Sequence, residues 1–150
     1  MTKLTRRQFV IVSGSALGVA ALGFGPAQAK GNGYEELISK FTGGKTAVEG
    51  KLSLDMPEIA ENGNTVPVTI SVDSPMTADN YVKQVMVVAD GNPGPTVGTF
   101  HFTPSSGKAD VSTRIRLAKT QNVHAIAEMS DGSFYKTKRE VKVTIGGCGG

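Results

Sequence analysis

Cysteine, tryptophan and histidine are scarce in this sequence. Among its 150 residues there are one cysteine, two histidines and no tryptophan. A single cysteine excludes a disulfide within the chain and leaves only an intermolecular disulfide open. The two histidines, His101 and His124, lie far apart among the apolar residues of expected strands, so they lack the spacing of metal ligands. We therefore expect neither a metal site nor a bound cofactor.

An excess of charge is missing as well. The formal net charge is +3, from 16 basic and 13 acidic residues. Three of the basic residues, Lys3, Arg6 and Arg7, precede the first apolar run, in a segment without any acidic residue. The rest of the chain is therefore balanced, and nucleic acid, which binds clustered positive charge, is not an expected partner.

Known catalytic motifs are absent too. The sequence has no Ser-His-Asp pattern at a strand-to-helix turn and no glycine-rich phosphate-binding loop. We therefore expect a protein that is not an enzyme. Two groups of basic residues could meet an anionic partner or a bound sulfonate, but solvated strand faces are the preferred interpretation. These residues are Arg114 and Arg116 in one group, and Lys136, Lys138 and Arg139 in the other.

The first 29 residues have the three parts of a cleavable export signal, in the usual order. Basic residues end at Arg7, an apolar stretch rich in Gly and Ala covers 9–24, and Ala27-Gln28-Ala29 offers small residues for cleavage after Ala29. The apolar stretch is short and diluted by glycine, so a retained membrane-spanning helix is disfavoured.

Two adjacent arginines point to a particular export route. Arg6 and Arg7 are followed by the bulky apolar Phe9, which is typical of a twin-arginine signal. That route exports folded proteins, so we expect the product to fold before export and to reside in the periplasm. No second apolar segment of this kind follows the signal, and no membrane attachment is expected after cleavage.

Residues 30–145 are expected to form one all-β domain, an immunoglobulin-like sandwich with a short N-terminal helix. Apolar residues at helical spacing predict that helix over 34–41. Residues 66–72 alternate between apolar and polar side chains, which predicts a half-buried strand, and Pro67 suggests a sheet edge. About seven short strands without helices between them favour a sandwich over an α/β sheet. The expected strands are 48–54, 66–72, 81–89, 96–102, 111–117, 123–129 and 141–145.

The last expected strand is followed by Gly146-Gly147-Cys148-Gly149-Gly150, which contains the only cysteine. These glycines give the thiol nothing to pack against, and glycine populates nearly all of backbone space. We therefore expect residues 146–150 to form a flexible arm, on the order of 15 Å long when extended. Such an arm could carry Cys148 into a narrow active site.

The surroundings of Cys148 in the sequence indicate a carrier and not a catalyst. A free thiol is mostly protonated at neutral pH, and no basic residue adjoins Cys148 to activate it. Activation would then come from an enzyme into which the arm inserts, which makes Cys148 a covalent attachment site. Tethering also stops a reactive sulfur intermediate from diffusing away. A disulfide-linked dimer and a tail without a role stay open as alternatives.

The Gly-Gly-Cys-Gly-Gly segment resembles the substrate-binding arm of the SoxY family, the sulfur carriers of the bacterial thiosulfate-oxidising Sox system. This resemblance extends over most of the chain after residue 29, and it implies an immunoglobulin-like fold, a twin-arginine leader and sulfur attachment at Cys148. The further segments that carry it are Ser74-Pro75-Met76, Asp90-Gly91-Asn92-Pro93, Thr99-Phe100, Arg114-Ile115-Arg116-Leu117, Thr120-Gln121-Asn122-Val123 and Ser130-Asp131-Gly132.

The resemblance also implies a set of partners. A haem-containing SoxAX-like enzyme would join thiosulfate oxidatively to Cys148, and a SoxB-like hydrolase would then release sulfate. The sulfur left on Cys148 would be oxidised by a sulfur dehydrogenase or passed to storage, a choice that the sequence leaves open. Members of the family work as a heterodimer with SoxZ, so we expect a second immunoglobulin-like chain to cover a face or an edge of the domain.

Two other classes of carrier fit the sequence less well. A ubiquitin-like carrier would use Gly149-Gly150 as a thiocarboxylate. That chemistry needs ATP, which the periplasm lacks, and a β-grasp core with a central helix, whereas the helix expected here is N-terminal. A metal-binding carrier would use Cys148 with the histidines and methionines, but the methionines are scattered and better explained as core or surface filling. The methionines concerned are Met56, Met76, Met86 and Met129.

Overall fold

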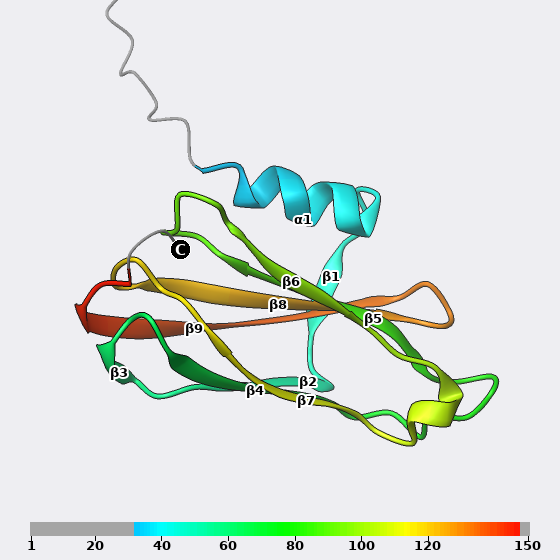
Figure 1. Ribbon diagram of the computed structural model, residues 1–150. Coiled ribbons are helices and arrows are strands. Elements are labelled where there is room, and N and C mark those ends of the chain that lie inside the picture. Colours follow the sequence, from blue (N-terminus) through cyan, green and yellow to red (C-terminus); the bar gives the residue numbers. More distant parts are fainter. Residues whose placement is uncertain (1–31, 148–150) are drawn as a thin grey trace, which may run out of the picture.

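The computed structural model describes residues 32–147, which form two packed β-sheets with one helix outside them (Figure 1). One sheet has the strand order β1-β9-β8-β5-β6, with β3 also paired to β9, and the other has the order β2-β4-β7. This is the predicted immunoglobulin-like sandwich. Its elements are α1 (Tyr34–Thr42), β1 (Ala47–Glu49), β2 (Leu52–Asp55), β3 (Ile59–Asn62), β4 (Val66–Val72), β5 (Val82–Ala89), β6 (Thr96–His101), the 3-10 turn η1 (Pro104–Ser106), β7 (Ala109–Ile115), β8 (Gln121–Met129) and β9 (Phe134–Ile145).

Helix α1 forms where it was predicted and covers the outer face of the first sheet. Its first turn carries two glutamates and its last turn a lysine, an order that suits the helix dipole. Gly43 ends it in the left-handed conformation, with φ at 60°. Among residues 32–147, no helix is long and apolar enough to span a membrane. The partly buried side chains that dock α1 are Tyr34, Leu37, Ile38 and Phe41, and they pack on Met86, Val88, Ile126 and Phe134.

The cover by α1 explains why β5 is apolar on both faces. Every residue from Val85 to Ala89 is buried. Val85 and Val87 belong to the core between the sheets, whereas Met86 and Val88 belong to the cluster under α1. In the sequence, a strand that is buried on both faces is a continuous run of apolar residues, without the alternation of apolar and polar residues that marks a half-buried strand.

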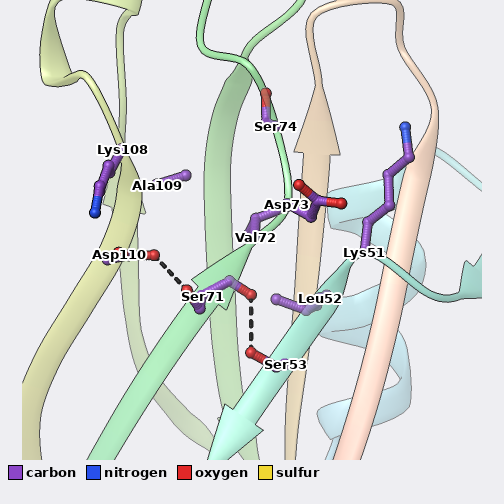
Figure 2. Close-up of a pocket in the computed structure, with 10 residues that line it drawn as sticks. All are labelled: Lys51, Leu52, Ser53, Ser71, Val72, Asp73, Ser74, Lys108, Ala109 and Asp110. Carbon is purple, nitrogen blue, oxygen red and sulfur yellow. Dashed lines mark hydrogen bonds between the residues drawn. The ribbon is translucent and has the colours of Figure 1, made fainter.

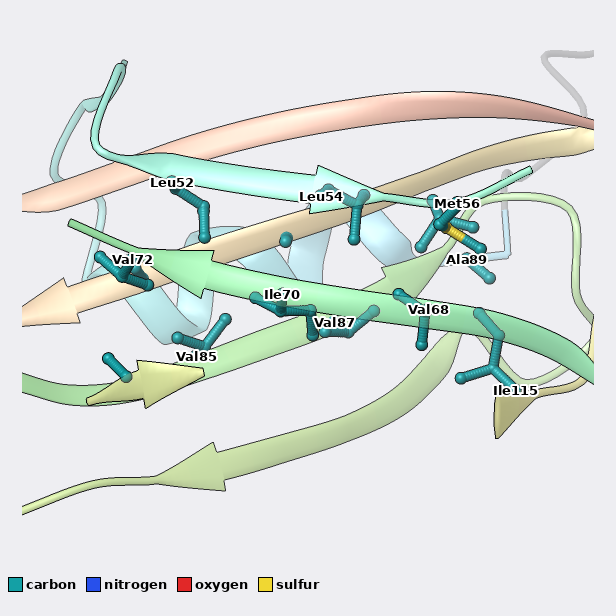
Figure 3. Packing of buried hydrophobic residues seen from close by; sticks show 14 of the residues in the cluster. Leu52, Leu54, Met56, Val68, Ile70, Val72, Val85, Val87, Ala89 and Ile115 are labelled. Carbon is teal, nitrogen blue, oxygen red and sulfur yellow. The ribbon is translucent and has the colours of Figure 1, made fainter. Parts of the chain in front are cut away.

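The second sheet has one covered and one open face, and β4 shows this most clearly. Val68, Ile70 and Val72 point into the core, where they meet side chains of β2 and β5 (Figure 3). The residues between them are polar or partly exposed. Each fully buried aliphatic side chain contributes about 2 kcal/mol, so this alternation fixes which face of the strand turns inward.

The prediction that Pro67 marks an edge strand is wrong, because β4 lies between β2 and β7. Proline is tolerated there because β2 pairs only with residues 69–72 of β4. Pro67 is in register with Arg114 of β7, and no β2 residue lies opposite it. The missing amide proton of Pro67 therefore interrupts no ladder on the β2 side.

The single strand predicted over 48–54 is two strands in different sheets. Gly50 and Lys51 break it, with φ of 121° and 52°. The chain thereby crosses from β1, beside β9, to β2, beside β4. Strand β3 was not predicted, and β9 begins at Phe134, well before the predicted start at residue 141.

Candidate functional site

The predicted site lies at the C-terminal arm, and the structure describes the first two arm residues, Gly146 and Gly147. The leader over residues 1–29 falls outside the described part of the chain, as does most of the arm. Whether the arm is flexible stays a prediction. The predicted site residues outside the described range are Arg6, Arg7, Cys148, Gly149 and Gly150.

Strand β9 carries the chain to the arm and is held on both sides at its end. Strand β8 covers it as far as Val141. Beyond that point, the Val143 amide donates a hydrogen bond to the Thr120 hydroxyl over 2.9 Å. On the other side β3 pairs with β9 in parallel and places Asn62 in register with Ile145. The last strand residue therefore has a defined place in the sandwich.

Three backbone hydrogen bonds surround the point where the arm leaves the domain. The Gly63 amide donates to the Ile145 carbonyl oxygen over 2.7 Å, and the Leu117 amide donates to the Gly63 carbonyl oxygen over 2.7 Å. The Gly147 amide then donates to the Leu117 carbonyl oxygen over 2.9 Å. Together with the chain from Ile145 to Gly147, these bonds close a ring. We call Gly63, Leu117 and residues 145–147 the arm root.

Contacts at the arm root are so close that only glycine fits. A Cβ atom on Gly63 would overlap the Leu117 carbonyl oxygen and lie 2.7 Å from the Gly147 nitrogen. A Cβ atom on Gly147 would lie 2.7 Å from the Gly63 carbonyl oxygen, and one on Gly146 would overlap the carbonyl oxygen of Ala118. None of these three glycines is among the described glycines with positive φ. Close approach, and not an unusual backbone conformation, therefore accounts for them.

A buried pair of amide side chains supports the arm root from behind. Asn92 and Gln121 are 3% and 5% exposed. The Asn92 Oδ1 accepts hydrogen bonds from the Ala118 amide over 2.9 Å and from Gln121 Nε2 over 2.7 Å, and its Nδ2 donates to the Arg116 carbonyl oxygen over 2.9 Å. Buried polar groups persist where they are satisfied in this way. Leu117 thus has the arm on one side and this network on the other.

Asp90 follows β5 and lies next to the same network. Burial alone would raise the pKa of its carboxyl group, but hydrogen bonds from the amide and side chain of Asn122, both 2.9 Å, and the contact with His124 outweigh it. The pKa of Asp90 is therefore held below its ordinary value. His124 Nε2 lies 3.3 Å from the Asp90 carboxylate, and its ring stacks on Tyr34 with centroids 5.1 Å apart. His124 consequently links the sheet to α1.

The other histidine lies away from His124, and the described methionines fill the core. His101 lies exposed at the end of β6, and β5 separates β6 from the β8 strand that carries His124. Within residues 32–147, no group of three or more His, Cys, Asp or Glu side chains gathers as a metal site would require. The four methionines that were considered as ligands are core residues: Met56, Met76, Met86 and Met129.

The two predicted basic groups lie apart, one at the end of β7 and just after it, the other on β9. Arg114 and Arg116 are exposed and border a hollow of about 430 Å³ that is lined by residues of β6 and β7. Lys136, Lys138 and Arg139 belong to β9. Of these five basic residues, only Arg116 adjoins the arm root, because it directly precedes Leu117.

A separate polar hollow of about 500 Å³ lies at the far end of the second sheet (Figure 2). In its wall the Ser71 hydroxyl donates a hydrogen bond to the Asp110 carboxylate. Val72, which also lines it, ends β4, whereas Val66 at the other end of β4 is in register with Ile115, two residues before the arm root. Seven strand residues span about 20 Å. This hollow is therefore too distant to take part in presenting the arm.

One protein family matches the chain. Its description is "Sulfur oxidation protein SoxY", and the match covers residues 38–148. The matched segment begins in α1, contains the whole sandwich and the arm root, and reaches Cys148. Among curated proteins, no sequence matches the chain.

Several solved structures are similar to this chain. The sulfur carrier protein SoxY from Chlorobium limicola f thiosulfatophilum is 32% identical, with a TM-score of 0.61 over 75% of this chain and 96% of that one. A superoxide reductase (neelaredoxin) from Ignicoccus hospitalis is 21% identical, with a TM-score of 0.56 over 63% and 80% of the two chains. A putative superoxide reductase from Thermotoga maritima is 18% identical, with a TM-score of 0.54 over 69% and 89%. The similarity to the two reductases concerns the fold alone.

Proposed function

Since the chain belongs to the SoxY family of sulfur carrier proteins, we propose that it holds the intermediates of thiosulfate oxidation as covalent adducts of Cys148 in the periplasm. The observation that carries this proposal is the family match, which runs from α1 to Cys148 itself. The arm root adds a structural argument, because it delivers the chain to residue 148 from a defined point of the sandwich.

Loading of the carrier is an oxidation. The Cys148 thiol and the outer sulfur of thiosulfate form a sulfur–sulfur bond, with the loss of one proton and two electrons. A haem-containing partner enzyme would accept these electrons. Water then attacks the terminal sulfonate of the adduct, which releases sulfate and leaves a persulfide on Cys148. The persulfide sulfur is oxidised further or passed on by other partners.

The described surroundings of the arm favour a carrier without catalytic groups of its own. Next to the arm root lie backbone amides and carbonyls and the side chains of Asn92 and Gln121. None of these groups titrates near neutral pH, so none is a general base for a thiol. A base that activates Cys148 is therefore supplied by the enzyme that receives the arm.

The remaining parts of the proposal follow from the sequence and the family. Residues 1–29 direct a folded protein through the twin-arginine route and are then removed. A SoxZ-like chain pairs with the sandwich, and SoxAX-like and SoxB-like enzymes load and hydrolyse the adduct. The ubiquitin-like alternative has less support, because it expects a β-grasp core, whereas the described residues form two packed sheets.

The direct test replaces the attachment residue. Cys148→Ser should abolish thiosulfate-dependent electron release in a reaction reconstituted with the partner subunit, the haem enzyme and the hydrolase. Because serine differs from cysteine by one atom and glycines flank residue 148, we expect the melting temperature to stay within about 1 °C of the original. Retained turnover with the serine variant would exclude Cys148 as the carrier site. A matched control, Ser112→Ala on the exposed face of β7, should leave turnover unchanged.

A further inference from the structure

The position of the pivot decides how far a tethered thiol can reach. If the arm moved freely from the end of β9, three peptide units would separate the pivot at Ile145 from Cys148, a reach of about 10 Å. If the chain is held as far as Gly147, only one peptide unit of about 3.8 Å separates the pivot from Cys148. The two cases place the Cα atom of Cys148 in volumes that differ by more than tenfold, because the volume grows as the cube of the reach.

The contacts of the arm root support the second case. Gly147 is buried and its amide is bonded to Leu117, while Gly63 bonds both Ile145 and Leu117. Gly146 lies so close to the Ala118 carbonyl oxygen that no side-chain atom fits between them. Free rotation about the backbone bonds of Gly146 would break these contacts. Glycine is therefore needed here to bring backbones together, which is the opposite of its role in a flexible linker.

The partner segment of the arm root is itself rigidly held. Leu117 is fully buried. The carbonyl group before it and the amide group after it are both bonded to Asn92, which in turn is bonded to Gln121. Because this buried network fixes the backbone around Leu117, Leu117 cannot move together with the arm. Movement of Gly147 therefore requires its hydrogen bond to Leu117 to break.

We propose that Gly63, Gly146 and Gly147 form an anchor for the carrier arm, so that Cys148 pivots from Gly147 and not from Ile145. Gly63 is then a positioning residue, although it lies 85 positions before Cys148 in the sequence. The name carrier arm rests on the proposed function. A partner enzyme that receives the arm would have to approach the body of the protein at the arm root, or else break the anchor on docking.

The anchor is tested first in the unmodified full chain by amide hydrogen exchange and ¹⁵N relaxation. The Gly147 amide should exchange at least about tenfold more slowly than an unstructured glycine, and its order parameter should approach that of rigid backbone, about 0.8. Exchange of Gly147 at the rate of an unstructured glycine, or an order parameter below about 0.6, would overturn the proposal.

Substitutions then test the role of glycine. A nitroxide label can be attached to Cys148, the single cysteine of the chain, and a second label to a cysteine introduced by Ser112→Cys on β7. Pulsed electron paramagnetic resonance then measures the distribution of distances between the two labels. Gly63→Ala or Gly147→Ala should at least double the width of the distance distribution and remove the protection of the Gly147 amide. Gly98→Ala is the matched control, because a Cβ atom there meets nothing within 4 Å. An unchanged distribution in both anchor variants would contradict the anchor.

Two features keep this test separate from that of the proposed function. The exchange measurement on the unmodified chain needs no variant, so it decides the matter even where Gly63→Ala fails to fold. It also needs no sulfur chemistry, so a failed anchor leaves the carrier function standing. Conversely, a Cys148→Ser variant that retains turnover would remove the carrier function and leave the anchor intact.

Discussion

The amide of Gly147 donates a hydrogen bond to the carbonyl oxygen of Leu117 over 2.9 Å, and so joins the residue before Cys148 to the loop that follows β7. That loop is held from its other side by Asn92. The stability of the sandwich and the placement of the arm therefore depend on the same few groups. Changes far from Cys148 in the sequence are expected to alter how it is presented.

Removing the Asn92 side chain should weaken both the domain and the arm root. Asn92→Ala leaves the Arg116 carbonyl and the Ala118 amide without their side-chain partner. It also removes one of the hydrogen bonds of the buried Gln121 side chain, which keeps its bond to the Lys119 carbonyl oxygen. We expect a loss of about 3 kcal/mol in the free energy of unfolding and a melting temperature roughly 10 °C lower. Thermal unfolding followed by circular dichroism measures this.

Asn80→Ala serves as the control for this prediction, because Asn80 is exposed. Its free energy of unfolding should change by less than about 0.5 kcal/mol. Equal melting temperatures for Asn92→Ala and Asn80→Ala would show that the buried network contributes nothing to the stability of the domain.

The carboxylate of Asp90 should make stability depend on pH in the acid range. Its pKa is held below the ordinary value of 3.8. Its charge-dependent stabilisation is therefore fully present above about pH 4 and is lost as the pH falls through the lower, folded-state value. Asp90→Asn lacks this contribution at every pH.

We expect the free energy of unfolding of Asp90→Asn to be about 2 kcal/mol lower than that of the original protein at pH 7. This gap between the two free energies should narrow below pH 4. Urea unfolding at pH 7, 5 and 3 measures the gap. Asp55→Asn, at an exposed position on β2, is the matched control. A gap that stays constant or widens toward pH 3 would refute the assignment of Asp90.

The docking of helix α1 should depend in part on an aromatic contact at its C-terminal end. Phe41 meets the ring of Phe134 edge-on, with centroids 5.9 Å apart. Phe41→Ala should lower the free energy of unfolding by about 2 kcal/mol and speed hydrogen exchange of the α1 amides. Lys40→Ala, which removes only an exposed ion pair with Glu36, should cost no more than about 0.5 kcal/mol. Similar losses from the two variants would contradict the docking of α1 through Phe41.

Much of the sandwich could be predicted from the sequence because its strands carry strong side-chain patterns. Residues 66–72 alternate as a half-buried strand does, and α1 ends close to the position that its glycines indicate. The crossing at Gly50 and Lys51 could not be foreseen, because the apolar residues around it, Val48, Leu52 and Leu54, keep the even spacing of a single strand. Strand β3 was missed since its pairing with β9 depends on the backbone and only two of its residues are apolar.

The arm root was missed for the same reason. Gly63 and Gly147 are joined through Leu117 by backbone groups alone, and hydrogen bonds between backbones leave no trace in the order of side chains. From the sequence alone, the glycines of residues 146–150 therefore predict only flexibility. One signal was available: Asn92 and Gln121 lie in two of the segments that carried the resemblance to the family. A buried amide pair in such segments could have indicated a network that supports something nearby.

The central claim is that Cys148 carries sulfur intermediates, and mass spectrometry of the intact protein tests it most directly. The protein is purified from the periplasm of cells grown on thiosulfate and is measured before and after thiol reduction. We predict mass additions that are removed by reduction, that map to the peptide containing Cys148, and that match a thiosulfonate or added sulfur atoms. An unmodified thiol under these conditions, or a disulfide-linked dimer alone, would contradict the account.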